Sequence, residues 1–275
     1  MDLQAYLQRI GVSGKARVDL QTLRAIHRRH LLSVPYENID VQLEVSGGTS
    51  VESAFEKIVL RERGGWCYEM NGLLGWALSE IGFSVTRLSA GVARSTQGDA
   101  VMGNHLVLLI ELNNQLWIVD TGFGDGLFEP VQLTPQTFEQ RGFAFGLSRT
   151  GDGYWRLLNH RFGGAPSFDF LNQPANEDEL DDQCYHLQTD DNSPFVLALV
   201  CQQFVEQGYE TQLGRVARRQ AHDAQGDDGD PEQGHHHQHQ APDDVGPHGR
   251  GVGPLDRKST RLNSSHSSVS RMPSS

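Results

Sequence analysis

The first part of the chain places its hydrophobic residues at the spacing of amphipathic helices. Asp19 is a typical N-cap residue for a helix that begins at Leu20 and breaks at Val34-Pro35, because the residue before a proline disfavours helical geometry. Gly82 is a plausible end for the last helix of this part. The predicted helices span residues 2–11, 20–34, 51–62 and 67–81. We therefore predict that residues 1–82 form a helical bundle.

After residue 82 the pattern changes to short runs rich in β-branched and aromatic residues. The segment Thr150-Gly151-Asp152-Gly153 lies between two such runs and is a good hairpin signal. The predicted strands span residues 83–94, 105–112, 116–120, 142–149 and 154–158. These predict an antiparallel β-barrel or sheet over residues 83–190, and residues 191–219 begin a smaller α/β unit. The fold class is α+β.

From about Gln220 the composition changes abruptly. Residues 221–254 contain no Leu, Ile, Met, Phe, Tyr or Trp, so they lack the apolar surface that offsets the entropy of ordering. We predict that residues 220–275 are disordered, and we interpret the run His235–His239 as low-complexity sequence rather than a metal site. Residues 256–275 resemble a translated sequencing adapter, and the preceding stretch resembles a shifted reading frame. We assign no function to residues 221–275.

Charge and composition exclude several classes of function. The 275 residues carry a formal net charge of −12, which argues against nucleic acid as a partner. No apolar run is long enough to span a bilayer, and the N-terminus lacks the features of a signal peptide. Cys67, Cys184 and Cys201 show neither metal-binding nor disulfide spacing, so we expect a cytoplasmic protein without a metal.

The segment 63–72, RGGWCYEMNG, carries the main chemical signal. It predicts a two-glycine turn, Gly64-Gly65, that delivers Cys67 to the first turn of a helix. The positive end of the helix dipole favours the thiolate, which is the nucleophilic form of cysteine. An isolated cysteine is more often a small buried apolar residue, but the glycine pair favours a site where a ligand approaches the main chain.

A cysteine nucleophile needs a base and a group that orients the base. His105 begins a predicted strand and Asp120 ends the next one, and the short turn 113–115 joins them. Two antiparallel strands joined in this way place their outer ends side by side, so we expect His105 and Asp120 to be close together. Taken alone, Asp120 is also a common turn-former before glycine, and His105 could be an ordinary strand residue.

Several segments together resemble the arylamine N-acetyltransferase family. They are MDLQAYLQRIG, SVPYENID, EKIVLRERGGWCYEMNGLLGWAL, NHLVLLIEL and LWIVDTGFGDGLFEPVQL, and the resemblance runs from residue 1 to about residue 215. It implies a papain-like core with a helical bundle, a β-barrel and an α/β lid. It also implies that Cys67 accepts the acetyl group, His105 is its base and Asp120 orients His105. The implied reaction moves acetyl from acetyl-coenzyme A to arylamines, arylhydroxylamines or hydrazines, with no permanently bound cofactor.

The resemblance implies roles for further residues. Those implied to contact the substrates are Phe123, Tyr36, Gly103, Asn104 and Gly124, although Phe123 is equally well explained as a core aromatic. Arg9, Glu37 and Arg63 are implied to pair with one another beneath the site, because buried charges need partners. Glu69 and Asn71 are implied to support the turn and the helix start. We expect a monomer or a weak homo-oligomer.

Two other functions stay open on the sequence. A papain-like or transglutaminase-like cysteine hydrolase would use the same three residues, because fold alone does not decide function. The chain could also be an inactive truncated homologue, since a foreign C-terminus would deprive the lid of its last strands and helix.

Overall fold

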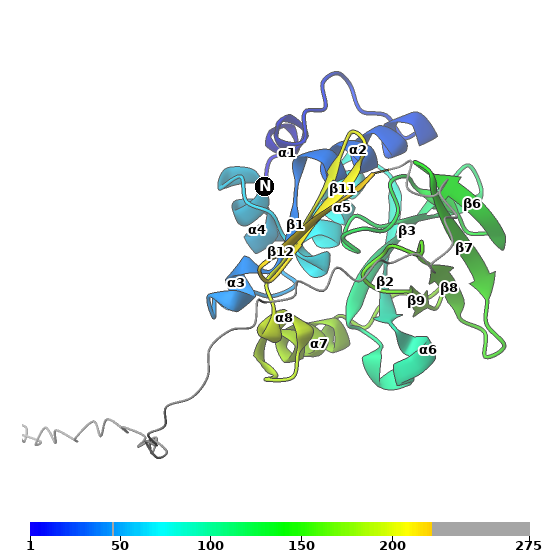
Figure 1. Cartoon of the computed structure of the whole chain (residues 1–275). Coiled ribbons are helices and arrows are strands. Elements are labelled where there is room, and N and C mark those ends of the chain that lie inside the picture. The colour runs from blue at the N-terminus through cyan, green and yellow to red at the C-terminus, as the bar shows by residue number, and fades with distance from the viewer. Residues whose placement is uncertain (46, 222–275) are drawn as a thin grey trace, which may run out of the picture. The chain divides into compact units, whose positions relative to one another are not determined.

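In the computed structural model, helix α5 (Cys67–Ile81) lies where the N-terminal helices meet the large sheet (Figure 1). Apolar residues occupy most of its circumference, and eleven of its residues are buried, from Cys67 to Leu78. A helix with this composition must be enclosed by other elements. Its neighbours are α1 (Leu3–Arg9), α2 (Leu20–Ser33), α4 (Val51–Phe55), β2 (Ser84–Val92) and β3 (His105–Leu112).

The predicted helices of the N-terminal part are present, with one change of geometry. The Asp19 carboxylate accepts the N–H of Thr22 at 2.7 Å as an N-cap, and Gly82 ends α5 with a φ of 108°. The predicted helix over 51–62 is divided into α4 and a π-helical turn, η1 (Glu56–Leu60), in which the N–H of Arg61 donates to the carbonyl of Glu56. A short helix, α3 (Ile39–Gln42), was not predicted.

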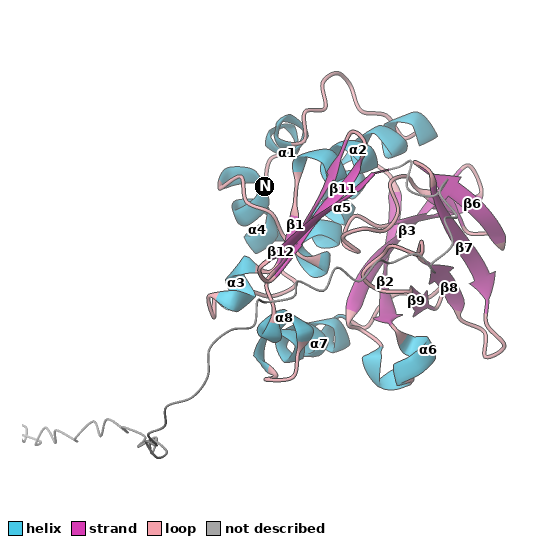
Figure 2. Ribbon diagram, in the orientation of Figure 1, coloured by secondary structure: helices cyan, strands magenta, loops and turns pink. Residues whose placement is uncertain are grey.

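The middle of the chain forms an eight-stranded antiparallel sheet, in the order β5-β4-β3-β2-β9-β8-β7-β6. The sheet is strongly curled, and Figure 2 shows how it separates from the helix-rich part. The strands after β3 are β4 (Gln115–Val119), β5 (Val131–Gln132), β6 (Gln136–Gln140), β7 (Phe143–Arg149), β8 (Trp155–Leu158) and β9 (Ser167–Phe170). The predicted α+β fold is therefore confirmed.

Strand β3 separates two hydrophobic cores because successive side chains point to opposite faces of a sheet. Leu106, Leu108 and Ile110 face the core that contains α5, whereas Val107 and Leu109 face the core enclosed by the curled sheet. Each fully buried side chain of this kind stabilises the fold by about 1.5–3 kcal/mol. Burial on both faces explains why the segment 105–112 is almost continuously hydrophobic.

The last described part consists of small helices and a second sheet. This sheet has the order β1-β10-β11-β12, so the early strand β1 (Tyr36–Glu37) pairs with residues far along the chain. The remaining elements are α6 (Arg94–Gln97), the 3-10 helix η2 (Asp99–Val101), α7 (Glu177–Thr189), α8 (Pro194–Leu197), β10 (Val200–Val205), β11 (Gly208–Leu213) and β12 (Val216–Ala221).

Helix α7 corrects the prediction that residues 83–190 form only a barrel or sheet. Asn176 caps it by accepting the N–H of Asp178 at 3.1 Å, and three acidic residues occupy its first turn, which is favourable for the helix dipole. Leu180 and Cys184 are its buried residues. These signals are readable in the sequence, but the low hydrophobic content of the segment obscures them.

The structure describes residues 1–45 and 47–221, which lie within one compact unit. Residues 220 and 221 belong to β12, so the predicted disordered region does not begin at 220. The predictions for residues 222–275, including the histidine run and the adapter-like segment, lie outside the described residues.

Candidate active site

Cys67 is the first residue of α5, and only 3% of its surface is exposed. The glycines before it permit a close approach of two backbone segments: a Cβ atom on Gly64 would lie 2.3 Å from the carbonyl oxygen of Pro35. The N–H of Gly65 donates to this carbonyl at 3.1 Å, and the N–H of Glu37 donates to the carbonyl of Gly65 at 2.9 Å. These contacts fix the turn that leads into Cys67.

His105 and Asp120 lie together, as their positions at neighbouring strand ends predict. The distance from His105 Nε2 to Asp120 Oδ2 is 2.8 Å, and both residues are buried. An ionised carboxylate can only accept hydrogen bonds, so the Nε2 atom of His105 carries the proton. The Nδ1 atom of the neutral ring then has the free lone pair that a base requires.

Asp120 is held as a carboxylate in spite of its burial. Burial acts to raise its pKa, but the electrostatic interaction and hydrogen bond with His105 and the hydrogen bonds from Asn71 and the Gly122 N–H outweigh this effect. The pKa of Asp120 is therefore lowered from its ordinary value. From helix α2, the ring of His27 contacts the backbone of Asp120, with Nε2 3.0 Å from its carbonyl oxygen.

Asn71 has a different role from the one that the resemblance implies. Its Nδ2 group donates to Asp120 Oδ1 at 2.8 Å and to the carbonyl of Leu106 at 2.6 Å, and its Oδ1 atom accepts the N–H of Thr121 at 2.8 Å. It therefore supports the carboxylate of Asp120 rather than the turn before Cys67. The sequence gives no local signal for this, since the partners lie 35 to 50 residues away.

Cys67 and His105 both line one cavity of about 620 Å³. Burial raises the pKa of the Cys67 thiol well above its ordinary value of 9.0, and the nearby Cys184 and Asp120 reinforce this. The N–H groups of Leu106 and Tyr68 oppose the rise without cancelling it. The net effect of the surroundings is therefore to favour the neutral thiol, so formation of the thiolate requires a further partner besides the helix start.

The structure brings three of the five predicted substrate-contact residues to the cavity wall. These are Tyr36, Asn104 and Phe123, and the ring of Phe123 lies edge-on to that of His105 with 5.5 Å between their centroids. The other two, Gly103 and Gly124, are not among the lining residues. The carbonyl of Gly103 accepts the hydroxyl of Tyr68 at 2.7 Å, and Gly124 packs against Gln202.

Residues from distant parts of the chain complete the cavity wall. Gly122 packs directly on α5, since a Cβ atom there would lie 2.6 Å from Cys67 Cα. Helix α7, helix α8 with its N-cap, and strand β10 also line the cavity. Their lining residues include Gln183, His186, Leu187, Ser193, Phe195 and Gln202. Sequence reasoning missed them because no local pattern links these segments to Cys67.

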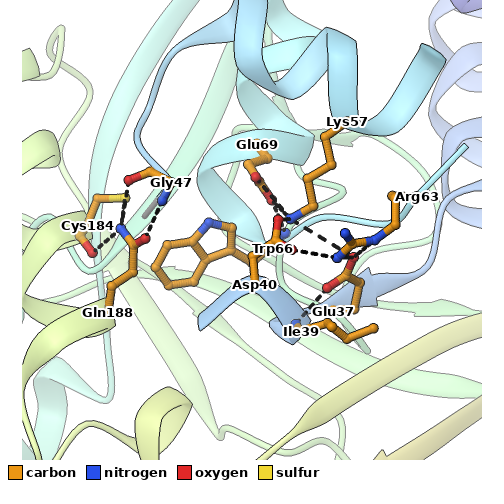
Figure 3. Close-up of polar contacts among 10 residues, drawn as sticks. All are labelled: Glu37, Ile39, Asp40, Gly47, Lys57, Arg63, Trp66, Glu69, Cys184 and Gln188. Carbon is orange, nitrogen blue, oxygen red and sulfur yellow. Dashed lines mark hydrogen bonds and ion pairs between the residues drawn. The ribbon is translucent and has the colours of Figure 1, made fainter. Parts of the chain in front are cut away.

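The predicted charged support beneath the site is correct in part (Figure 3). Arg63 and Glu37 form an ion pair with an N–O distance of 2.9 Å. Arg9 does not join them: its guanidinium donates to backbone carbonyls, including those of Ser33 and Ile58. The sequence reasoning missed Lys57, which is buried among carboxylates of this region. In the sequence, Lys57 looks like a solvent-exposed helix residue.

Other features of the described chain concern metals, thiols and membranes. Within residues 1–45 and 47–221, no cluster of three or more His, Cys, Asp or Glu side chains is arranged to hold a metal ion. Across the same residues, no helix has the length and apolar character to cross a membrane. Cys67, Cys184 and Cys201 are free thiols.

Comparisons with known proteins agree with this geometry. A family model described as N-acetyltransferase matches residues 19–232. An arylamine N-acetyltransferase of Mycolicibacterium smegmatis is 38% identical over 206 residues, which cover 72% of this chain and 75% of the relative. A solved structure of the M. smegmatis arylamine N-acetyltransferase matches with a TM-score of 0.72 and 35% identity, and covers 80% of this chain and 83% of its own. The structure of Mycobacterium marinum arylamine N-acetyltransferase in complex with CoA matches with a TM-score of 0.72 and 27% identity, over 78% of this chain and 82% of its own.

The fold and these matches define the chain as an acyltransferase with an α+β architecture. It belongs to the arylamine N-acetyltransferase family. The resemblance inferred from the RGGWCYEMN and DTGFGDG segments is thereby confirmed, although the family model begins at residue 19 and extends to residue 232 rather than ending near 215.

Proposed function

We propose that this chain transfers an acetyl group from acetyl-coenzyme A to the nitrogen of arylamines, arylhydroxylamines or hydrazines. The transfer proceeds in two steps through an acetyl group on Cys67. The observation that carries the proposal is the placement of Cys67 and His105 on one cavity wall, with Asp120 bound to His105 at 2.8 Å. Family membership and the CoA complex of the M. marinum relative support the choice of acetyl donor.

In the first step, the Nδ1 atom of His105 accepts the proton of the Cys67 thiol. The resulting imidazolium stabilises the thiolate, which burial alone would disfavour, and Asp120 stabilises the imidazolium. The thiolate sulfur forms a bond to the carbonyl carbon of the thioester. The bond from that carbon to the sulfur of coenzyme A then breaks, and His105 returns the proton to the departing thiolate.

The tetrahedral intermediate carries a negative charge on its oxygen, which needs hydrogen-bond donors. The first N–H groups of a helix have no partner within the helix, and the helix dipole adds positive potential there. Because Cys67 is the first residue of α5, its own N–H is placed to serve as such a donor.

In the second step, the nitrogen of the acceptor attacks the acetyl carbon and His105 takes a proton from that nitrogen. The bond to the Cys67 sulfur breaks, which regenerates the thiolate and imidazolium. An aromatic amine is largely unprotonated near neutral pH, so its nitrogen is available as a nucleophile. Phe123 and Tyr36 line the cavity beside Cys67 and provide aromatic contact for the acceptor ring.

The decisive experiment is mass spectrometry of the chain after exposure to acetyl-coenzyme A. We expect one acetyl group on the peptide that contains Cys67, and we expect a simple arylamine such as aniline to remove it as the acetylated amine. A Cys67→Ser variant is the matched control and should gain no stable acetyl group. Release of acetate in place of acetylated amine would indicate a hydrolase, and absence of the acetyl-cysteine would overturn the proposal.

We also propose that the chain works in the cytoplasm without nucleic acid or membrane, as a monomer or weak homo-oligomer. The net charge of −12 and the three free thiols support this setting. Light scattering over a range of protein concentrations tests the oligomeric state directly.

A further inference from the structure

A cluster of five charged side chains lies beside the first turn of α5, the helix that begins at Cys67 (Figure 3). The members of this partly buried charge cluster are Glu37, Asp40, Lys57, Arg63 and Glu69. Three of them are carboxylates and two are cations, and each cation lies within ion-pair distance of at least two carboxylates. The side chain of Lys57 is 11% exposed, compared with 33% for Arg63, which makes Lys57 the more buried cation.

Lys57 uses all its hydrogen-bonding capacity inside this cluster. Its Nζ atom lies 2.8 Å and 3.1 Å from the two carboxylate oxygens of Glu69 and 2.9 Å from Asp40 Oδ2. An ammonium group has three N–H donors, and three oxygens receive them. Lys57 belongs to the π-helical turn η1, and three residues separate the end of this turn from Gly64. It therefore connects the segment before the turn with the helix after it.

Glu69 connects the cluster to the reactive cysteine. Its Oε2 atom accepts the N–H of Trp66 at 3.2 Å, and Trp66 is the residue immediately before Cys67. The same oxygen would lie 3.0 Å from a Cβ atom on Gly65, so the carboxylate lies tightly against the turn. Among the residues that the structure describes, Lys57 is the only cation within ion-pair distance of Glu69.

The ionised state of Glu69 depends on this cation. Burial raises the pKa of Glu69, and the charge and hydrogen bonds of Lys57 oppose that rise. Glu37 from β1 and Cys184 from α7 also face this carboxylate, and the negative charge of Glu37 adds to the rise. Without Lys57, the pKa of Glu69 would rise further, and a protonated carboxyl group is a weaker acceptor for the Trp66 N–H than a carboxylate.

We propose that Lys57 is a positioning residue for Cys67: it holds the Glu69 carboxylate against the Trp66 N–H and thereby fixes the start of α5 and the direction of the thiol. The geometry of attack depends on that direction, and a small misplacement of a reacting group has a large effect on rate. This inference rests on the proposed function only in naming acetyl transfer as the affected reaction. The orientation of Cys67 is measurable without any acetyl donor.

The test compares Lys57→Met with Lys57→Arg and with Arg61→Met. Met removes the charge at similar length, Arg keeps it, and Arg61 is an exposed neighbour that pairs only with Glu56 in the described structure. For Lys57→Met we expect the rate of Cys67 alkylation by iodoacetamide to fall about 10- to 100-fold. We expect the same fall in kcat for acetyl transfer, with KM changed less than about twofold. Lys57→Arg should recover most of both rates, and Arg61→Met should equal the unmodified chain.

Equal alkylation rates in Lys57→Met and the unmodified chain would overturn the proposal, as would a rise in KM at constant kcat. If Lys57→Met does not fold, Glu69→Gln carries the test, because the amide keeps an acceptor for Trp66 while the charge is lost. Glu69→Gln is expected to slow alkylation, and an unchanged rate would overturn the proposal. If the unmodified chain transfers no acetyl group, the proposed function fails, yet the alkylation comparison still decides the role of Lys57.

Discussion

The side-chain amide of Asn71 lies 2.8 Å from Asp120, so the helix that carries Cys67 also holds the carboxylate that orients His105. Asn71 follows Cys67 by four residues, about one helical turn, which places both residues on the same face of α5. Any movement of α5 therefore displaces Cys67 and the support of Asp120 together. The contact between Asn71 and Asp120 therefore links the positions of Cys67, His105 and Asp120 through α5.

This coupling predicts the effect of Asn71→Ala. The change leaves the N–H of Thr121 and the carbonyl of Leu106 without their buried partner, so we expect the free energy of unfolding to fall by about 1–3 kcal/mol. The rate of acetyl transfer should fall as well, because Asp120 loses one of its donors. Urea unfolding measures the first effect and steady-state kinetics the second. The exposed Asn172→Ala is the control, and equal behaviour of the two variants would contradict the assigned role.

The reactivity of Cys67 should depend on pH in a way that reveals His105. With His105 present, proton transfer inside the site forms the thiolate, and alkylation by iodoacetamide proceeds near neutral pH. In His105→Gln, the buried thiol must lose its proton to solvent, and burial raises the pKa of that thiol well above 9.0. Alkylation of the variant should therefore increase only at pH values above 9.0. A variant that reacts at pH 7 as fast as the unmodified chain would show that His105 does not activate Cys67.

The glycine after Thr121 has a steric role that Gly122→Ala tests. A Cβ atom at this position would lie 2.6 Å from Cys67 Cα and 2.8 Å from Asn71 Nδ2, so the loop must move away from α5. We expect a loss of about 1–3 kcal/mol in stability from this overpacking, and a fall in kcat of about 10- to 100-fold from the displaced Asp120. Thermal unfolding and kinetics provide the measurements.

Gly151→Ala is the matched control for this change, because nothing lies within 4 Å of a Cβ atom on Gly151. It should leave both stability and kcat close to those of the unmodified chain. If Gly122→Ala also left stability and kcat unchanged, the close packing of this loop on Cys67 would not matter for activity.

The local parts of the fold and site follow from the sequence, whereas the long-range contacts do not. Periodicity and capping residues predict α2 and α5, and the glycine pair before Cys67 marks the turn. The short turn between β3 and β4 predicts that His105 and Asp120 meet. Each of these predictions depends on the geometry of a single short segment, so it can be made without knowing how distant segments pack.

Other features depend on segments that are distant in the chain. Lys57 has the pattern of a surface lysine until Asp40 and Glu69 enclose it. Arg9 is predicted to form an ion pair, yet its guanidinium donates to the backbone carbonyls of Ile58 and Ser33, because the packing of the helices brings these oxygens within reach of its N–H groups. No pattern in the sequence distinguishes these outcomes, since each depends on which elements pack together.

Phe123 offers a test of how the acceptor ring is bound. Its ring lies edge-on to His105 and to Phe168, with centroid distances of 5.5 Å and 5.0 Å, and it lines the cavity beside Cys67. In Phe123→Ala we expect acetylation of Cys67 by acetyl-coenzyme A to keep its rate. Transfer from acetyl-Cys67 to aniline should slow by about 3- to 10-fold, the effect of losing one aromatic contact. Rapid-quench measurements on the isolated half-reactions separate the two steps. Phe138→Ala, a change on β6 outside the cavity, is the control, and equal slowing of both half-reactions in Phe123→Ala would show that Phe123 supports the core rather than the acceptor.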